Sequence, residues 1–136
     1  MSELIIEAKI ENLKQVLSFV DEHLERLSCP LRTQMRLDVV VEELFVNIAS
    51  YAYAFGTGDA TIRIEETEDP LEFSVTFIDS GIPYDPLKKD DPDITLPAEN
   101  RKIGGLGIFM AKKIMDEMQY TRKEGKNILT IRKKLV

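Results

Sequence analysis

The residues with the clearest chemical potential are Glu43 and Asn47, which lie four positions apart in a largely apolar stretch. In a helix, this spacing places both side chains on one face. A carboxylate and an amide oxygen are hard ligands that suit magnesium, and a carboxylate could also deprotonate an attacking hydroxyl group. The alternative is an amphipathic helix with a polar edge. Glu42 faces elsewhere, about 100° further round the helix.

A second group is Asp79-Ser80-Gly81, which directly follows the apolar run 71–78. An acidic residue at the end of a strand can accept a hydrogen bond from an exocyclic amino group, such as that of adenine. A glycine two residues later lets the backbone approach a flat ligand closely. The alternative is an ordinary turn in which the Asp79 side chain bonds to its own backbone.

A third group is the glycine-rich run 104–107, GGLG, which precedes a helical pattern. Glycines allow close backbone approach, and the N–H groups at the start of a helix favour phosphate. The run is neither a Walker A loop nor a full Rossmann fingerprint. The alternative is a flexible hinge.

Hydrophobic periodicity predicts the elements that must position these groups. Strands are expected over 4–10, 60–66, 71–78, 119–123 and 127–133, and helices over 11–27, 31–54 and from about 107 onward. The helix over 31–54 is apolar over most of its circumference, which predicts that it is largely buried. Strands gathered against a few helices indicate an α+β fold with two layers, in one domain that spans residues 1–136.

The segment 79–105 has no clear periodicity and carries four prolines and many charges. Such a long structureless segment is typical of a lid or a binding loop. We expect residues 84–103 to become ordered when a nucleotide binds. The alternative is a mobile surface loop.

Composition excludes several classes of function. The net charge of −6 argues against a general nucleic-acid binder, which needs lysine and arginine to replace phosphate counterions. One cysteine, Cys29, and one histidine, His23, leave no internal disulfide, no usual zinc site and no serine–histidine triad. No apolar run approaches the length of a membrane span or forms a signal peptide. A cytoplasmic protein is the expectation.

The order of these groups resembles that of the GHKL ATPases. The segment 43–47, ELFVN, is similar to their N box, 79–86, DSGIPYDP, to their first glycine box, and 104–108, GGLGI, to their second. Within that superfamily the chain looks like the anti-sigma-factor serine kinases of the SpoIIAB and RsbW type, above all in 79–86 and 104–120. The resemblance implies the GHKL (Bergerat) sandwich, a mixed sheet packed against about three helices.

The resemblance also implies roles for individual residues. Asn47 would coordinate Mg²⁺ that bridges the phosphates of ATP, and Glu43 would act as the general base on a serine or threonine hydroxyl. Arg101 would neutralise charge on the transferred phosphoryl group. Two departures stand out: 50–53, SYAY, lacks a histidine often seen in relatives, and the segment 88–102 matches poorly.

For the nucleotide itself, the resemblance implies that Asp79 binds the adenine amino group with help from Gly81. Gly104, Gly105 and Gly107 would let backbone amides approach the phosphates. A third departure concerns the last strand, where Asn127 stands in place of a turn that contains threonine in many relatives.

The function implied is that of an ATP-dependent protein serine/threonine kinase that also acts as an anti-sigma factor. It would sequester a sigma factor, phosphorylate a STAS-domain antagonist, and so regulate transcription in a bacterium. A homodimer is expected, without contact to nucleic acid or membrane. The alternative is a non-catalytic module that binds ATP as a structural ligand and a signalling partner. Glu43 favours the enzyme, because nucleotide binding alone needs no base.

Overall fold

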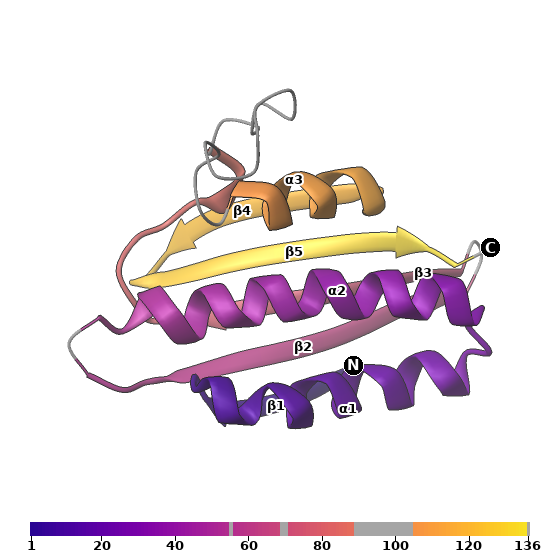
Figure 1. Ribbon diagram of the computed structural model, residues 1–136, viewed down its shortest axis with the longest axis horizontal. Helices are drawn as coiled ribbons and strands as arrows, with labels where there is room; N and C mark the ends of the chain where they lie inside the picture. The colour runs from indigo at the N-terminus through magenta and orange to yellow at the C-terminus, as the bar shows by residue number, and fades with distance from the viewer. Residues whose placement is uncertain (55, 69–70, 89–104, 136) are drawn as a thin grey trace.

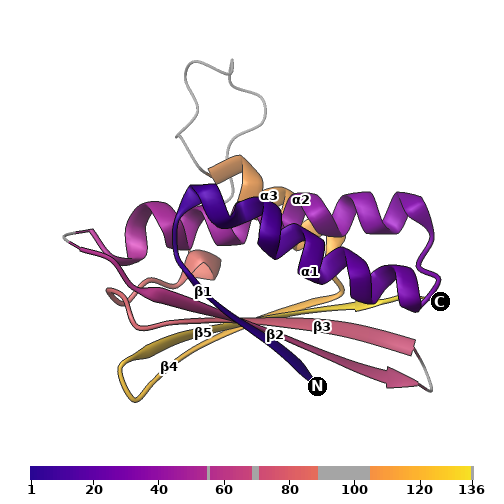
Figure 2. The same cartoon turned by 90° about the horizontal axis from the view of Figure 1, so that it is seen from below.

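The computed structural model describes residues 1–54, 56–68, 71–88 and 105–135. They form a five-stranded sheet with all three α-helices on one face, in two layers (Figures 1 and 2). The strands are β1 Ser2–Glu7, β2 Asp59–Glu68, β3 Leu71–Asp79, β4 Glu117–Lys123 and β5 Lys126–Lys134. The helices are α1 Leu13–Arg26, α2 Leu31–Asn47 and α3 Gly105–Ile114, with 3₁₀ turns at Ile10–Asn12 (η1) and Pro86–Lys88 (η3). The predicted α+β sandwich is therefore confirmed.

The strand directions differ from the expected mixed sheet. The order is β1-β2-β3-β5-β4, and all four pairings of neighbouring strands are antiparallel. The connection through α3 returns the chain so that β4 runs in the same direction as β3, but the β4–β5 hairpin places β5 between them. β3 and β4 therefore share no hydrogen bonds, and no two neighbouring strands of this sheet are parallel.

The core forms where alternate strand residues meet the apolar sides of the helices. On β3, the side chains of Phe73, Val75 and Phe77 point toward the helices and are almost fully buried. The expected apolar stripe of α1 lies over the sheet, with Val16 and Val20 fully buried. Because Asp79 continues the inward alternation of β3, the strand delivers this carboxylate to the same side as the core.

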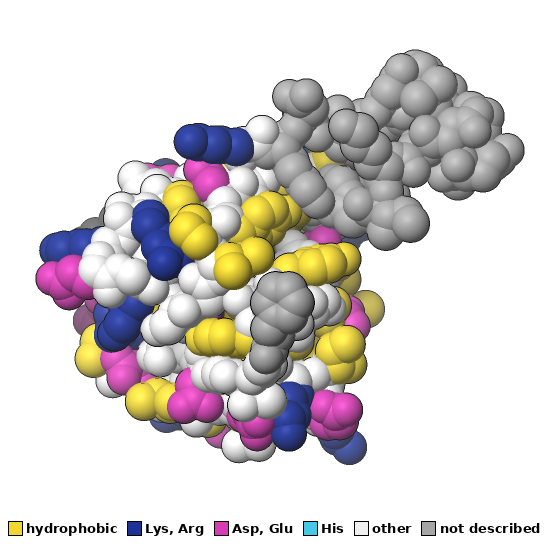
Figure 3. Space-filling model, turned by 90° about the vertical axis from the view of Figure 1, so that its left-hand side faces the viewer, with side chains coloured by type: hydrophobic (Ala, Val, Ile, Leu, Met, Phe, Trp, Pro, Cys, Tyr) yellow, Lys and Arg dark blue, Asp and Glu magenta, His cyan; other side chains and the backbone are white. Residues whose placement is uncertain are grey.

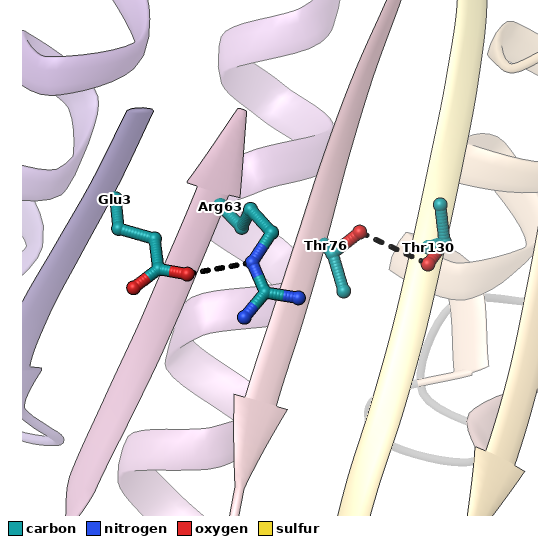
Figure 4. Close-up of polar contacts among 4 residues, drawn as sticks. All are labelled: Glu3, Arg63, Thr76 and Thr130. Atoms are coloured by element: carbon teal, nitrogen blue, oxygen red, sulfur yellow. Dashed lines mark hydrogen bonds and ion pairs between the residues drawn. The ribbon is translucent and has the colours of Figure 1, made fainter. Parts of the chain in front are cut away.

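The opposite face of the sheet is not covered by any described helix (Figure 2). Polar side chains on this face pair across neighbouring strands (Figure 4). Arg63 donates to the Glu3 carboxylate at 2.7 Å, and the hydroxyl groups of Thr76 and Thr130 lie 3.0 Å apart. These bonds hold the register of β1 on β2 and of β3 on β5.

Helix α2 departs from the sequence prediction in two ways. Its α-helical part ends at Asn47 and continues as a π-helical segment, η2, over Ile48–Ala52. It is also less enclosed than its composition suggests, because Met35 and Val39 are 61% and 50% exposed. Short π-helical segments are rare and occur often at functional sites.

Two carboxyl groups face each other where α1 packs against α2. Burial, followed by a hydrogen bond and charge repulsion from Asp21, raises the pKa of Asp38 from 3.8 to about 8, and Glu25 adds to the repulsion. One oxygen of Asp21 and one of Asp38 are buried without a hydrogen-bond partner in the described chain. Between about pH 4 and pH 8 the folded state therefore holds a proton on Asp38 that the unfolded state has already released.

Because the folded state binds more protons in that window, its stability should fall as the pH rises from about 4 to about 8. Replacing Asp38 by asparagine removes this loss, since an amide can donate to Asp21 at any pH. We expect Asp38→Asn to raise the free energy of unfolding at pH 8 by about 1–2 kcal/mol, after allowance for solvent screening. The gain should shrink toward pH 5.

Urea denaturation of both proteins at pH 5 and pH 8 measures this effect. Glu22→Gln is the matched control, because Glu22 is exposed on the same helix pair and its replacement should not alter the pH dependence. A variant Asp38→Asn that is no more stable than the unaltered protein at pH 8 would contradict the assignment.

No helix in the described ranges is both long enough and apolar enough to cross a membrane.

Candidate functional site

A cavity of about 290 Å³ opens at the end of the sheet where α2, η2 and β3 terminate and β5 begins. Figure 3 looks onto this end of the molecule, where hydrophobic side chains gather. The residues that line it are Leu44, Asn47, Ile48, Tyr51, Ala52, Phe77, Asp79, Ile82, Pro83, Tyr84, Pro86, Tyr120, Asn127 and Leu129. An apolar cavity with a few convergent polar groups is typical of a site for a small ligand. Two of the predicted residues, Asn47 and Asp79, lie in its wall.

Asp79 is the buried anionic group of this cavity. Its side chain is only 6% exposed. The backbone N–H of Gly81 and the side-chain amide of Asn127 both donate to its Oδ1 atom, each at 2.9 Å. The bond from Gly81 is the turn that the sequence offered as an alternative to a binding role. The structure thus combines the two interpretations, because the turn fixes a carboxylate that also lines the cavity.

Asn127 lies directly opposite Asp79 in the register of β3 and β5 and is equally buried. Its amide nitrogen donates to Asp79 and to the backbone oxygen of Ile82, the latter at 2.8 Å. Its Oδ1 atom accepts from the Tyr120 hydroxyl and from the backbone N–H of Tyr84. Sequence reasoning gave this residue no role beyond marking its difference from relatives. The available signal was its place in the strand, where Asn127 shares the alternation of the apolar residues Leu129 and Ile131.

Tyr53, just after η2, ties three segments together at one edge of the site. Its hydroxyl donates to the backbone oxygen of Asp59 at 2.7 Å and accepts from the N–H of Ser80 at 2.8 Å. Burial, partly offset by the hydrogen bond from Ser80, raises the pKa of the Tyr53 hydroxyl above its ordinary value. The hydroxyl therefore remains a donor at neutral pH. The sequence showed only an aromatic residue after a helix and did not predict this link.

Gly81 packs tightly against the backbone at the end of η2. The N–H of the next residue, Ile82, donates to the backbone oxygen of Ala52 at 3.0 Å. A Cβ atom at Gly81 would overlap that same carbonyl group. The predicted need for glycine here is therefore explained by contact between two backbone segments, which bring the end of β3 against the end of α2.

Glu43 lies one turn before Asn47 on α2 and faces the start of α3. Its carboxyl group occupies the space that a side chain on Gly107 would fill. Helix α3 begins at Gly105, so this carboxylate lies beside a helix N-terminus, where partial positive charge stabilises an anion. The structure thus brings the predicted Glu43 and Gly107 together, close to the predicted Asn47.

Of the other predicted site residues, only Gly105 lies within the described residues. Gly105 is the first residue of α3. Arg101 and Gly104 lie outside the described residues, as does most of the predicted lid over 84–103.

The side chains available as ligands determine how this site could hold a metal ion. Among the described residues, no group of three or more histidine, cysteine, aspartate or glutamate side chains could enclose a metal ion. Mg²⁺ typically keeps several waters and binds through one or two protein oxygens together with substrate phosphates. The Asn47 side chain at the cavity wall fits that mode. Asp79 fits an adenine amino group, because its carboxylate accepts hydrogen bonds and lines an apolar cavity.

Comparison with known proteins gives a match over nearly the whole chain. Residues 6–133 match the family described as the histidine kinase-like ATPase domain. The serine-protein kinase RsbW of Bacillus cereus is 31% identical over 97 residues, which are 68% of this chain and 59% of that protein. The chain thus aligns with about three-fifths of the length of this curated relative.

Two solved structures have the same fold. The RsbU and RsbW domains of a Mycobacterium tuberculosis protein give a TM-score of 0.65 at 16% identity, covering 99% of this chain and 33% of that one. The SiaB–SiaC complex of Pseudomonas aeruginosa gives 0.59 at 17% identity, covering 96% of this chain and 88% of the matched chain. At these identities the likeness concerns the fold alone.

Proposed function

Because the chain belongs to the histidine kinase-like ATPase domain family, we propose that it is an ATP-dependent protein serine/threonine kinase. The GHKL resemblance of the sequence is thereby confirmed at the level of the family. The observation that carries the proposal is the convergence of Glu43, Asn47 and Asp79 on one end of the molecule. A named relative, RsbW of Bacillus cereus, is a serine-protein kinase and supports it.

In this mechanism ATP would supply the phosphoryl group, and a bound Mg²⁺ would supply positive charge beside its phosphates. Asp79 would accept a hydrogen bond from the adenine amino group in the cavity that it lines. Asn47, which also lines the cavity, would offer its side-chain oxygen to the metal. Glu43 would take the proton from the substrate hydroxyl group as its oxygen bonds to the γ-phosphorus of ATP, and ADP would leave with the electrons of the phosphorus–oxygen bond that breaks.

Gly105 and Gly107 would let the first turn of α3 approach the phosphates, because N–H groups at a helix start have no partner within the helix. Gly104 and Arg101 are proposed to complete this side, with Arg101 acting on the transferred group. Residues 1–136 would then act as one ATP-binding unit in the cytoplasm.

The proposed substrate is a STAS-domain anti-anti-sigma protein, and the proposed second partner is a sigma factor that the protein withholds from RNA polymerase. The resemblance to anti-sigma-factor kinases motivates both partners. The solved SiaB–SiaC complex shows that a protein of this fold binds another protein. A homodimer is proposed through β1 and α1, since β1 is an edge strand whose Ile5 is 64% exposed.

Two measurements test the proposal. Calorimetry with ATP and magnesium should show binding by the intact chain. Incubation with labelled ATP and the STAS-domain proteins of the source organism should then show transfer to a serine or threonine. Binding without transfer would favour the alternative of a non-catalytic ATP-binding module. The absence of heat and of a thermal shift at millimolar nucleotide would refute both.

Asp79→Asn should lower the affinity for ATP by about tenfold or more, the worth of a hydrogen bond to a charged group. The N–H donors of Gly81 and Asn127 should hold the new amide's oxygen in the place of Oδ1. Its amino group would then face the adenine amino group, donor against donor.

Competition with a fluorescent ATP analogue measures this loss. Asp116→Asn serves as the control, because Asp116 is exposed and accepts from the backbone N–H of Lys134, which pairs with Glu72 at the end of β3 opposite Asp79. Unchanged affinity in Asp79→Asn would remove the adenine role from this residue.

A further inference from the structure

We propose that Asn127 is the positioning residue that makes this site select adenine over guanine. The inference rests on the proposed function, since it concerns the same nucleotide cavity. It assigns the selectivity to a residue that does not itself contact the base. The evidence is the set of hydrogen bonds around one buried amide.

The amide of Asn127 is fully used by the protein. An asparagine side chain offers two N–H donors and two acceptor positions on its oxygen. Both donors are taken, by Asp79 and by the backbone oxygen of Ile82. Both acceptor positions are taken, by the Tyr120 hydroxyl and the Tyr84 N–H. Nothing on this amide is left to bind a nucleobase.

The same bonds determine which way the amide points. If the amide were turned over, its oxygen would face two acceptors, the Asp79 carboxylate and the Ile82 carbonyl. Its amino group would face the Tyr84 N–H, which is a donor. Unpaired buried polar groups are costly, by roughly 1–3 kcal/mol each. Asn127 is therefore held in one orientation, with its donor on Asp79.

This orientation restricts Asp79 in turn. Asn127 and the Gly81 N–H both hold Oδ1, so rotation of the carboxylate would break two bonds. The second oxygen, Oδ2, is then the acceptor that Asp79 can offer to a base in the cavity that it lines. Adenine presents an amino group to such an acceptor, whereas guanine presents a carbonyl oxygen at the corresponding position, which a carboxylate repels.

The position of Asn127 comes from the β4–β5 hairpin. The turn between these strands contains Glu124 and Gly125, with φ of 54° and 77°, as a tight hairpin turn requires. Asn127 follows two residues later, opposite Asp79 on β3. A short turn thus sets the register that places the amide against the carboxylate.

The test measures the affinities of the intact protein for ATP and for GTP, each with magnesium. Asn127→Ala should lower the preference for ATP by about tenfold, because Asp79 loses a hydrogen bond and can rotate. Tyr120→Phe leaves Asn127 and removes one bond that orients it, so the preference should fall in the same direction by a smaller factor. Thermal unfolding establishes that each variant is folded.

Thr130→Val is the matched control. It removes a hydrogen bond from the same strand, the bond to Thr76, on the face of the sheet away from the cavity (Figure 4). A loss of packing or stability alone would affect this variant as well, but the ATP-to-GTP ratio should stay unchanged in it.

A second readout is the pH profile of Asn127→Asp. This variant keeps the shape of the side chain and places a carboxyl group against Asp79, so the two groups must share a proton. Its affinity for ATP should therefore fall as the pH rises from about 5 to 8, unlike that of the unaltered protein.

The outcomes separate the two proposals. An unaltered ATP-to-GTP ratio in both Asn127→Ala and Tyr120→Phe would overturn the role of Asn127 while leaving ATP binding in place. Equal affinity of the unaltered protein for ATP and GTP would do the same. Failure of the unaltered protein to bind either nucleotide would overturn the proposed function itself.

Discussion

Replacing Glu43 should abolish phosphoryl transfer and leave ATP binding intact. Glu43 faces the start of α3 and is not among the residues that line the base cavity. Its loss therefore removes a base without disturbing the adenine contact. A positioned general base contributes on the order of a hundred- to ten-thousand-fold in rate. We expect a decrease of that size in both Glu43→Ala and the isosteric Glu43→Gln.

Replacing Asn47 should have a different effect from replacing Glu43, although the two residues lie one turn apart on the same helix. Asn47→Ala removes the proposed metal ligand, so both magnesium-dependent ATP binding and transfer should fall. The measurement pairs ATP affinity with single-turnover phosphorylation for each variant. Glu42→Ala is the control, because Glu42 is the exposed neighbour of Glu43. Full transfer by Glu43→Ala would defeat the general-base assignment.

If the protein also withholds a sigma factor, Glu43→Ala should become a constitutive inhibitor. It would still bind its sigma partner but could no longer phosphorylate the antagonist that competes for it. A reporter gene transcribed by that sigma factor should then stay silent, even when the antagonist is abundant.

The second large effect concerns two glycines whose replacement by alanine should damage different properties of the protein. At Gly81 the added Cβ would overlap the backbone carbonyl of Ala52, which the Ile82 N–H holds in place. Neither segment can move without breaking that bond. We expect Gly81→Ala to lose about 1–3 kcal/mol of stability, as overpacked sites do, and to lose ATP binding.

At Gly107 the added Cβ would instead meet the carboxyl end of Glu43, which can rotate away. Alanine also favours a helix more than glycine does, by up to about 1 kcal/mol. Gly107→Ala should therefore remain folded and lose phosphoryl transfer, because Glu43 is displaced from its position.

Thermal unfolding, ATP affinity and single-turnover transfer distinguish the two variants. Gly56→Ala is the control, since a Cβ at Gly56 would meet no atom within 4 Å. Unchanged transfer in Gly107→Ala would show that Glu43 is not required where the structure places it. Normal ATP binding by Gly81→Ala would show that the contact with Ala52 can relax.

The order of the elements and the two inward-facing residues Asn47 and Asp79 could be predicted from the amino-acid sequence. Helical and strand periodicities are local properties of the chain, and they place a residue on a face without knowledge of its neighbours. The predicted elements agree with the observed ones, apart from shifts at their ends and the end of α2 at Asn47.

The arrangement of strands was decided by tertiary structure. Sequence alone could not tell that β5 lies between β3 and β4, because the β4–β5 hairpin can join a sheet on either of its strands. That choice makes every neighbouring pair antiparallel and places Asn127 opposite Asp79.

The finer parts of the site follow from that packing. Tyr53, Asn127 and Gly81 acquire their roles only through contacts with residues distant in the sequence. Whether such hydrogen bonds form depends on differences of a few tenths of an ångström in the distance between donor and acceptor. No periodicity of the sequence specifies distances that closely. The sequence by itself determined which residues are the candidates for the chemistry proposed for this protein. Tertiary structure decided which residues hold them in position, because buried polar groups must find partners wherever the fold brings them.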